Sequence, residues 1–443
     1  MKYNTTYKVS YRLSIPSLFR LFYYLHNMLQ VHQSSNLKWS IQVGGAKNAV
    51  LPIYAANILT HWAIKLDNLP DISDIHHMQK VIDQANEAYT NDPSYYDLSS
   101  ELCGKFRASI LLIPAGLIKC GKVKFYGVGG CKIGKRPLDA FDHAFIKAGI
   151  RITEWEHKEF EVISKPAKKI IMDELSVTAT EAILTYLAFC DADYAIDLYE
   201  CAIEPHVINH IDFLRHIGAD ITVHFDHHFT IKPRKLASDY SSYSSFPIIW
   251  DSLEGLFYLI IGATAPHSEV TVSGFDVDEL NAVRVEFDKI GIDYEILWPD
   301  SVRASSKNLQ HYKSIKMQTM IYPGLCTDAQ PMIGALLTRC NGISKIHEKM
   351  YEGRFGYLTE LGNLGAKFEV LNPHQVVVMW PIDLKWWYLG STDLRWWAAA
   401  IICGILAEWV THVSSEEWIL RWYENIIGKL QQLGVSIERV ESE

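Results

Sequence analysis

The chain has 443 residues, of which 49% are hydrophobic and 21% are charged. This length exceeds that of one ordinary core, so the composition predicts a folded protein of two or more domains and excludes a disordered or fibrous chain. The formal net charge of -9 argues against nonspecific binding to nucleic acid, so any local cluster of cations is expected to face a small anion.

The eight cysteines form no CxxC pair and show no metal-ligand spacing. A chain of this size does not need disulfides to stabilise its core. The sequence therefore predicts reduced thiols in the cytoplasm, no metal and no cofactor. It makes no prediction of oligomeric state.

The segment from Ile15 to Val31 is the one place where a membrane helix has to be considered. Arg20, His26 and Asn27 interrupt it, it is short for a spanning helix, and no small-residue cleavage site follows. We expect neither a signal peptide nor a membrane span, and interpret residues 1–28 as an N-terminal extension or a start assigned too far upstream.

A helix-like stretch that ends in a Gly-x-x-apolar turn recurs every 69 to 74 residues. The five glycines are Gly149, Gly218, Gly291, Gly365 and Gly434. Glycine at such a place is typical of the residue just past a helix end, where a left-handed backbone is needed, and the apolar residue then begins a strand. Units of this length hold a whole supersecondary motif, so the pattern predicts six mixed α/β units.

Within the units, the patterns predict an apolar, small-residue helix, then a strand, then an amphipathic helix. Helices are expected at Ala49–Leu59, Ala108–Leu117 and Ala398–Ala407, and strands at Val123–Tyr126 and Val270–Val272. The Ser/Tyr-rich segment 238–245 separates the third unit from the fourth and is the best linker candidate. The chain is thus expected to form two α/β domains of three units each.

Residues 129–139 carry the most distinctive chemistry, because they place Cys131 among Lys132, Lys135 and Arg136 on a glycine-rich loop. Nearby cations favour the thiolate, which makes Cys131 a candidate reactive residue. The loop glycines allow close approach to a ligand. Two other interpretations stay open from these residues alone: a buried, inert thiol and a solvated group of cations.

Eight segments, in order and in spacing, resemble the enolpyruvyl transferases. They are VGGAKNAVLP (43–52), NLPDISDIHHM (68–78), FRAS (106–109), GGCKIGKRPLD (129–139), YPGLCTDAQ (322–330), EGRF (352–355), TDLR (392–395) and RWYE (421–424). The resemblance implies two inverse α/β-barrel domains, each of three pseudo-threefold-related units, with the active site in the cleft between them. We expect the first domain at 47–247, and the second at 29–46 plus 248–443.

The cysteine-bearing loop is similar to that of the branch acting on UDP-N-acetylglucosamine. The resemblance implies transfer of the enolpyruvyl group of phosphoenolpyruvate to the 3-hydroxyl of that sugar, with loss of phosphate, at the start of peptidoglycan synthesis. By the same resemblance Cys131 donates a proton to the methylene carbon, and Asp328 accepts the proton of the hydroxyl. Asp328 also fits a plain turn aspartate after Tyr322-Pro323-Gly324.

Four cations match the family positions that bind phosphoenolpyruvate, and Lys47 also counts among the catalytic residues. They are Lys47, Arg136, Arg395 and Arg421. The planar fork of arginine suits phosphate and carboxylate, and each charged hydrogen bond contributes roughly 1.5–3 kcal/mol. Each cation taken alone also fits a surface residue in a salt bridge.

The resemblance also implies a set of contacts to the nucleotide sugar. They are Asn48, Arg107, Pro137, Leu138, Asp139, Ser176, Val177, Asp328 and Tyr351. Asn48 stands at a helix start, so it also fits a helix cap.

The sequence departs from the family pattern on the nucleotide side. Phe141 stands where many members have histidine, while Glu174 and Ser252 stand where relatives have cations. Trp422 replaces the glycine of the family's Arg-Gly-Tyr-Glu. These departures leave two alternatives: an enolpyruvyl transferase with another acceptor, and a non-catalytic paralogue that binds the nucleotide sugar.

The paired tryptophans Trp386-Trp387 and Trp396-Trp397 could form binding platforms. Buried packing is the commoner role for such residues, and we expect it here.

Overall fold

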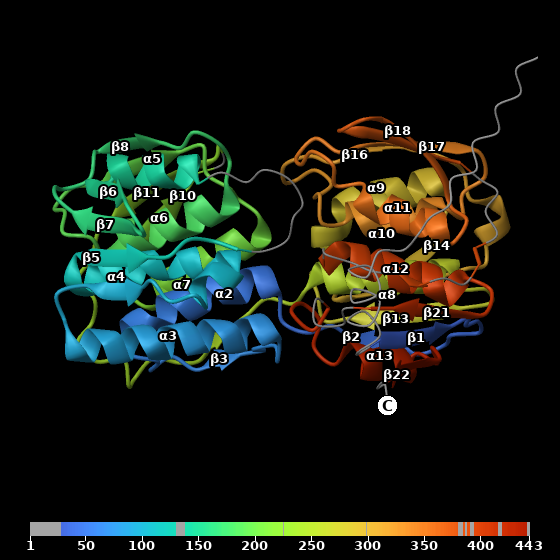
Figure 1. Ribbon diagram of the computed structural model, residues 1–443, viewed down its shortest axis with the longest axis horizontal. Coiled ribbons are helices and arrows are strands. Elements are labelled where there is room, and N and C mark those ends of the chain that lie inside the picture. Colours follow the sequence, from blue (N-terminus) through green and yellow to red (C-terminus); the bar gives the residue numbers. More distant parts are fainter. Residues whose placement is uncertain are drawn as a thin grey trace, which may run out of the picture.

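The computed structural model describes residues 28–129, 138–224, 226–297, 299–379, 384–385, 388–389, 394–414 and 419–440. These residues form two apolar cores. The core of the first body contains buried side chains between Ala46 and Ile248, and that of the second body contains those between Leu29 and Val43 and between Leu256 and Ile437. Figure 1 shows the two bodies side by side. We infer one domain around each core, with bounds close to those expected from the sequence; Ala46 and Ile248, expected in the second domain, pack in the first core.

Five four-stranded sheets of the described residues share one strand order. In each sheet two neighbouring strands are parallel, and the second of them pairs with one strand of an antiparallel pair. This antiparallel pair is a hairpin in four of the sheets and consists of β1 and β22 in the fifth. The first body contains two of these sheets. One consists of β4 (Tyr96–Leu98), β5 (Lys122–Phe125), β7 (Lys158–Val162) and β6 (Ile150–Glu154). The other consists of β8 (Lys169–Ile171), β9 (Ile196–Tyr199), β11 (His228–Lys232) and β10 (Asp220–Val223). The second body contains β2 (Ser40–Gln42), β13 (Glu269–Ser273), β15 (Ser301–Ser305) and β14 (Asp293–Leu297), then β16 (Lys316–Gln318), β17 (Ile343–His347), β19 (Gln375–Met379) and β18 (Lys367–Asn372), and finally β20 (Tyr388–Leu389), β21 (Val410–Val413), β1 (Met28–His32) and β22 (Ile437–Val440).

The N-terminal strands complete sheets of the second body. Strand β1 pairs antiparallel with both β21 and β22, and β2 runs parallel to β13. Figure 1 shows these two strands in the body that also holds the C-terminal elements. Met28 therefore belongs to a sheet strand, and the expectation for the preceding residues lies outside the described part of the chain.

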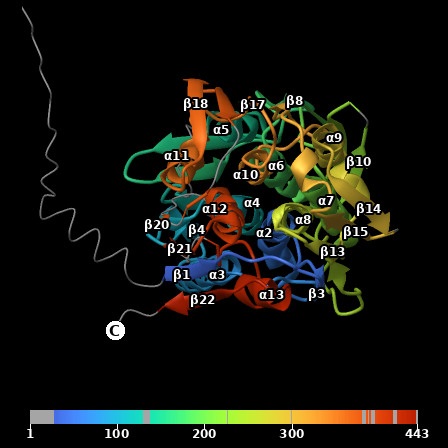
Figure 2. The ribbon, with the colours of Figure 1, turned by 90° about the vertical axis from the view of Figure 1, so that its right-hand side faces the viewer.

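Each body has three central helices that contact one another. They are α2 (Lys47–Ala56), α4 (Ile113–Cys120) and α6 (Val177–Phe189) in the first body, and α8 (Ser252–Thr264), α10 (Gln330–Leu337) and α12 (Leu394–Leu406) in the second. Figure 2 shows the second set surrounded by its sheets. A helix that is apolar on every side is stable only when it is buried. In α8 every residue from Glu254 to Thr264 is buried, which accounts for its place inside the body.

A second, amphipathic helix follows in each unit. These helices are α3 (Ser73–Asn91), α5 (Asp139–Lys147), α7 (Pro205–His216), α9 (Asn281–Ile290), α11 (Gly356–Asn363) and α13 (Ile426–Gln432). The five repeated glycines follow the last five of these helices, and all have positive φ, between 85° and 109°. Each glycine precedes a strand by one to three residues, at β6, β10, β14, β18 and β22. The predicted repeat is confirmed.

The unit that holds α2 and α3 differs from the others. It has only the two-stranded pair of β3 (Leu66–Asp67) and β12 (Phe246–Pro247) in place of a four-stranded sheet. Three predicted helix bounds also differ. The first helix ends as α-helix at Ala56 and continues as a 3-10 turn, Asn57–Thr60; the second begins as a 3-10 helix, Arg107–Leu112; and α12 begins at Leu394, four residues before the predicted start. Further 3-10 turns lie at Cys103–Lys105, Val277–Leu280 and Leu309–His311.

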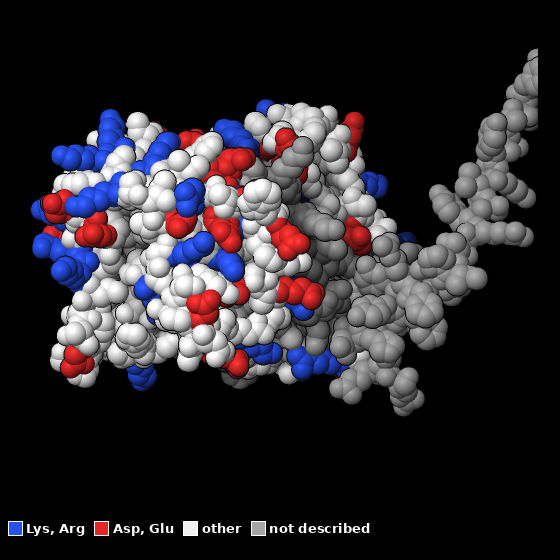
Figure 3. Space-filling view, turned by 60° about the vertical axis from the view of Figure 1, so that its left-hand side comes forward, with Lys and Arg blue, Asp and Glu red and all other residues white. Residues whose placement is uncertain are grey.

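No described helix combines the length and the apolar character that crossing a bilayer requires. Figure 3 shows acidic and basic side chains side by side over the described part of one face.

Candidate functional site at the junction of the two bodies

Lys47 and Arg421 share one buried carboxylate, that of Asp74. Lys47 is the first residue of α2, and its Nζ lies 2.6 Å from Asp74 Oδ2. Arg421 donates from Nε to Asp74 Oδ1 at 2.6 Å and from Nη2 to Oδ2 at 3.2 Å. Asp74 lies in the first turn of α3 and is 2% exposed. We call these three residues the Asp74 cluster.

The Asp74 cluster joins the two bodies, because Lys47 and Asp74 belong to the first and Arg421 to the second. Beside it, the backbone N–H of Ser73 donates to the carbonyl of Leu420 at 3.1 Å. Burial favours the neutral acid and so raises the pKa of Asp74, but Lys47 and Arg421 outweigh burial and hold that pKa below its usual value. Asp74 is therefore a carboxylate at neutral pH.

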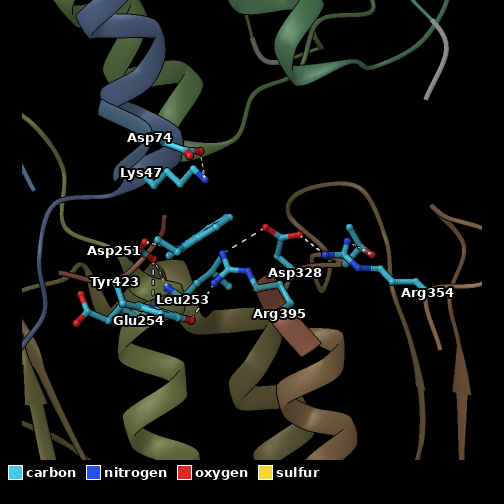
Figure 4. Close-up of polar contacts among 11 residues, drawn as sticks. Lys47, Asp74, Asp251, Leu253, Glu254, Asp328, Arg354, Arg395 and Tyr423 are labelled. Atoms are coloured by element: carbon cyan, nitrogen blue, oxygen red, sulfur yellow. Dashed lines mark hydrogen bonds and ion pairs between the residues drawn. The ribbon is translucent and has the colours of Figure 1, made fainter. Parts of the chain in front are cut away.

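Asp328 lies between two buried arginines of the second body (Figure 4). Arg354 donates from Nη2 to Asp328 Oδ1 at 2.7 Å, and Arg395 donates from Nη2 to Oδ2 at 3.3 Å. Both arginines are at most 2% exposed, whereas the Asp328 side chain keeps 24% of its surface exposed. Burial raises the pKa of Asp328, but the two guanidinium groups hold it well below the usual range. Asp328 does lie in a turn, as the alternative interpretation expected, and there it is paired with both arginines.

A buried glutamate fixes Arg354. Glu348 is 0% exposed and accepts hydrogen bonds at 2.8 Å from the hydroxyls of Thr319 and Thr327. Thr327 in turn accepts from Arg354 Nη1 at 2.8 Å. These hydrogen bonds, from Glu348 through Thr327, hold the guanidinium of Arg354 in the orientation in which it contacts Asp328.

Arg395, in the first turn of α12, is surrounded by aromatic rings. Its Cζ lies 3.2 Å from the ring centroid of Trp422, and its Nη1 donates to the hydroxyl of Tyr423 at 2.9 Å. Lys47 Nζ lies 4.8 Å from the same Trp422 ring. The indole thus contacts one cation of each body.

The structure places the other described contacts, except Tyr351, at or next to helix starts. Asn48 follows Lys47 in α2, and the N-cap of that helix is Ala46, so the helix-cap interpretation of Asn48 is wrong. Arg107 begins a 3-10 helix, Leu138 precedes α5, and Ser176 and Val177 lie at the start of α6; all four are half-buried. Asp139, the first residue of α5, is exposed. Tyr351 is half-buried, and its ring centroid lies 5.6 Å from Arg354 Cζ.

Cys131, Arg136 and Pro137 lie outside the described residues, as do Trp386 and Trp387. The loop that carries Cys131 begins at Gly129, which is described; an added Cβ there would lie 2.0 Å from the carbonyl oxygen of Gly104. Only glycine allows this approach. It places the loop's first residue against the turn that leads to Arg107.

The residues that depart from the family pattern have distinct surroundings. Phe141 is 3% exposed and stacks on Phe145 with ring centroids 4.5 Å apart, so it is a core residue. Glu174 is exposed. Ser252 begins α8 and forms a hydrogen bond with Glu279. Burial raises the pKa of Glu279 to about 7, with Asp251 and Asp276 adding to the rise and Ser252 opposing it.

Sequence reasoning assigned no role to Asp74, Arg354, Trp422 or His206. The first three lie inside the segments that carried the resemblance, so the signal was present. His206 is the second residue of α7 in the first body and interacts electrostatically with Asp328. Burial lowers the pKa of His206 to about 4, and Asp328 opposes that shift. Trp397 is fully buried and donates from Nε1 to the carbonyl of Ser414 at 2.9 Å, which confirms packing for this tryptophan.

Known proteins resemble this chain over nearly its whole length. The model of the EPSP synthase (3-phosphoshikimate 1-carboxyvinyltransferase) family matches residues 31–430. The chain belongs to this family of enolpyruvyl transferases. UDP-N-acetylglucosamine 1-carboxyvinyltransferase of Finegoldia magna is 30% identical over 431 residues, which cover 94% of this chain and 99% of that protein. The Synechocystis sp. enzyme of the same name is 31% identical over 440 residues, covering 94% and 95%.

Solved structures extend the likeness of this enolpyruvyl transferase to the whole fold. The enolpyruvyl transferase NikO from Streptomyces tendae superposes with a TM-score of 0.80 at 19% identity, covering 94% of this chain and all of that one. EPSP synthase from Acinetobacter baumannii gives a TM-score of 0.68 at 12% identity, with the same coverage. The fold is the two-domain inverse α/β fold of these enzymes.

Proposed function

We propose that this enolpyruvyl transferase transfers the enolpyruvyl group of phosphoenolpyruvate to the 3-hydroxyl of UDP-N-acetylglucosamine and releases phosphate, a step in peptidoglycan precursor synthesis. The observation that carries the proposal is the convergence of Lys47, Arg395 and Arg421 at the junction of the two bodies, with Asp328 in contact with one of them. The names of the relatives that match nearly the whole chain support the choice of acceptor.

Phosphoenolpyruvate carries a phosphate and a carboxylate, so its site needs several fixed cations. Lys47, Arg395 and Arg421 supply them, and the family resemblance assigns the same role to Arg136 of the cysteine loop. Asp74 and Asp328 balance the described cations before substrate arrives, because buried cations without an anion are strongly destabilising. Incoming phosphoenolpyruvate then competes with Asp328 for Arg395.

Asp328 accepts the proton of the sugar hydroxyl. Its two arginines make it a weak base in the free protein, because they stabilise its charged form. A bound anion that engages Arg395 adds negative charge nearby and so raises the pKa of Asp328. The base therefore gains proton affinity only when phosphoenolpyruvate is present.

The sugar oxygen bonds to C2 of phosphoenolpyruvate while Cys131 protonates C3, which gives a tetrahedral intermediate. Loss of the C3 proton and cleavage of the C2–O bond to phosphate then give the enolpyruvyl ether and inorganic phosphate. Cys131 must hold its proton before the addition step, and the charge of bound phosphoenolpyruvate offsets the cations that favour its thiolate.

The acceptor is bound by the predicted nucleotide-sugar contacts, which are Asn48, Arg107, Pro137, Leu138, Asp139, Ser176, Val177 and Tyr351. The reaction takes place in the cytoplasm, since a reducing compartment keeps the acid thiol in its working form.

The test is to incubate the purified protein with phosphoenolpyruvate and UDP-N-acetylglucosamine, and to measure the phosphate released and the mass of the product. We expect one phosphate per enolpyruvyl ether of the nucleotide sugar. Phosphate release with another acceptor but not with this one would change the substrate. Binding of the nucleotide sugar without phosphate release from any acceptor would indicate a non-catalytic paralogue.

A further inference from the structure

Trp422 contacts two cations that the proposed function assigns to phosphoenolpyruvate. Its ring centroid lies 4.8 Å from Lys47 Nζ and 3.2 Å from Arg395 Cζ. Lys47 begins a helix of the first body, and Arg395 lies in a helix of the second. One side chain therefore touches a cation of each body.

The indole is held in one orientation. Trp422 Nε1 donates to Asp251 Oδ2 at 2.9 Å. Asp251 is 5% exposed, and its other oxygen accepts from the backbone N–H groups of Leu253 and Glu254 at 2.9 and 3.0 Å, which fixes it as the N-cap of α8. The ring thus rests on the start of a central helix.

Stacking on an indole leaves the hydrogen-bonding edge of a guanidinium exposed to partners. Arg395 shows this directly, because it donates to Tyr423 and to Asp328 while its Cζ lies over the Trp422 ring. The negative face of an aromatic ring also attracts cations, and it does so more strongly in desolvated surroundings. The ring therefore stabilises two like charges close together while their donors remain available to an anion.

We propose that Trp422 is a positioning residue for the anionic donor: its ring face holds Lys47 and Arg395 in the arrangement that binds phosphoenolpyruvate. It acts through the two cations and leaves the acceptor side unaffected. The choice of phosphoenolpyruvate as the anion rests on the proposed function.

Three variants separate the ring face from the rest of the side chain. Trp422→Phe keeps an aromatic face and loses the Nε1 hydrogen bond, and Trp422→Leu loses both. Trp39→Leu is the matched control, because Trp39 is 65% exposed and is not one of the residues assigned to the site. The measurements are phosphoenolpyruvate affinity by calorimetry on the protein alone, and the KM of each substrate.

We expect Trp422→Leu to weaken phosphoenolpyruvate binding by about 5–30-fold, from two lost cation–π contacts, and to leave the KM for UDP-N-acetylglucosamine unchanged. Trp422→Phe should stay within about threefold of the unmodified protein, and Trp39→Leu should match it. Equal losses in the Phe and Leu variants would overturn the proposal, as would tighter binding in Trp422→Leu, which would mean that the indole blocks the anion.

The outcome also distinguishes this inference from the proposed function. If the unmodified protein binds phosphoenolpyruvate but releases no phosphate with the acceptor, the function fails, and the affinity comparison among the variants still decides the role of Trp422. If the unmodified protein does not bind phosphoenolpyruvate, both are wrong.

Discussion

Arg421 donates from Nε and Nη2 to the two carboxylate oxygens of Asp74, 347 residues away in the chain, at 2.6 and 3.2 Å. This two-point contact joins the second body to the first, and Lys47 binds the same carboxylate at 2.6 Å. One carboxylate of the first body therefore holds two of the candidate donor-binding cations, and its contact with Arg421 is one of the links between the bodies.

Asp74→Asn should destabilise the protein, because it leaves Lys47 and Arg421 close together without their anion. Removing one partner of a buried ion pair costs roughly 3–5 kcal/mol. We expect a loss of that size in the free energy of unfolding measured with urea. Asp71→Asn is the control, since the Asp71 side chain is 73% exposed and pairs only with His76 among the described residues. A loss below about 1 kcal/mol would contradict the structural role of Asp74.

Lowering the pH should reduce the free energy of unfolding, because Asp74 becomes protonated. The pKa of Asp74 is lowered in the folded state, so the carboxylate stabilises folding above its unfolded pKa of about 3.9 and loses that contribution as the pH falls through the lower folded value. We expect the urea midpoint to drop from about pH 5 downward. Asp74→Asn should show a shallower drop, and parallel pH profiles would rule out this cause.

Asp328→Asn keeps the size of the side chain and removes its ability to accept a proton. We expect turnover to fall by roughly 10²–10⁴-fold, the usual range for loss of a general base, with the KM for the nucleotide sugar little changed. Asp288→Asn, on the exposed surface of α9, should behave as the unmodified enzyme does. Retention of most turnover in Asp328→Asn would remove Asp328 from the mechanism.

Fosfomycin, an anionic epoxide, should label Cys131 before the other cysteines. The seven described thiols all have raised pKa values, which keeps them protonated at neutral pH. Cys326 is the strongest competitor because it is exposed, yet desolvation by surrounding atoms and the nearby Asp328 raise its pKa to about 11. Peptide mass spectrometry should find the adduct on Cys131; an adduct on Cys326 at equal yield would count against the assignment.

Glu174→Lys combined with Ser252→Arg should lower the KM for UDP-N-acetylglucosamine and leave that for phosphoenolpyruvate nearly unchanged. A charge-assisted contact to the diphosphate contributes roughly 1.5–3 kcal/mol, and the gain should shrink as salt is raised. Glu279 forms a hydrogen bond with Ser252 and has a pKa of about 7, so its carboxylate would compete for the new arginine above neutral pH. Adding Glu279→Gln should therefore increase the gain at pH 8 more than at pH 6. No gain in any of these variants would mean that the acceptor is bound through other residues.

Several features of the fold follow from local sequence. Gly149 and Gly365 were placed correctly after helices, because a left-handed residue at a helix end has a strong local signature. The apolar, small-residue segment 398–407 likewise predicted a helix, and most of it lies in α12. The bounds near Ala56 and Arg107 were wrong by a few residues, since 3-10 turns at helix ends depend on the neighbouring packing.

The candidate site, too, has features that follow from the sequence and features that depend on the tertiary structure. The sequence alone determined the α/β class, the repeated unit and, through eight short segments, the family and most of the candidate cations. Only the tertiary structure decided that Asp74 joins Lys47 to Arg421, that Arg354 and Arg395 hold Asp328 as a carboxylate, and that Trp422 contacts a cation of each body. The physical reason is range: a helix end or a repeat is specified by neighbours a few residues apart, whereas an ion pair between residues 347 positions apart exists only once both cores have formed and excluded water from it.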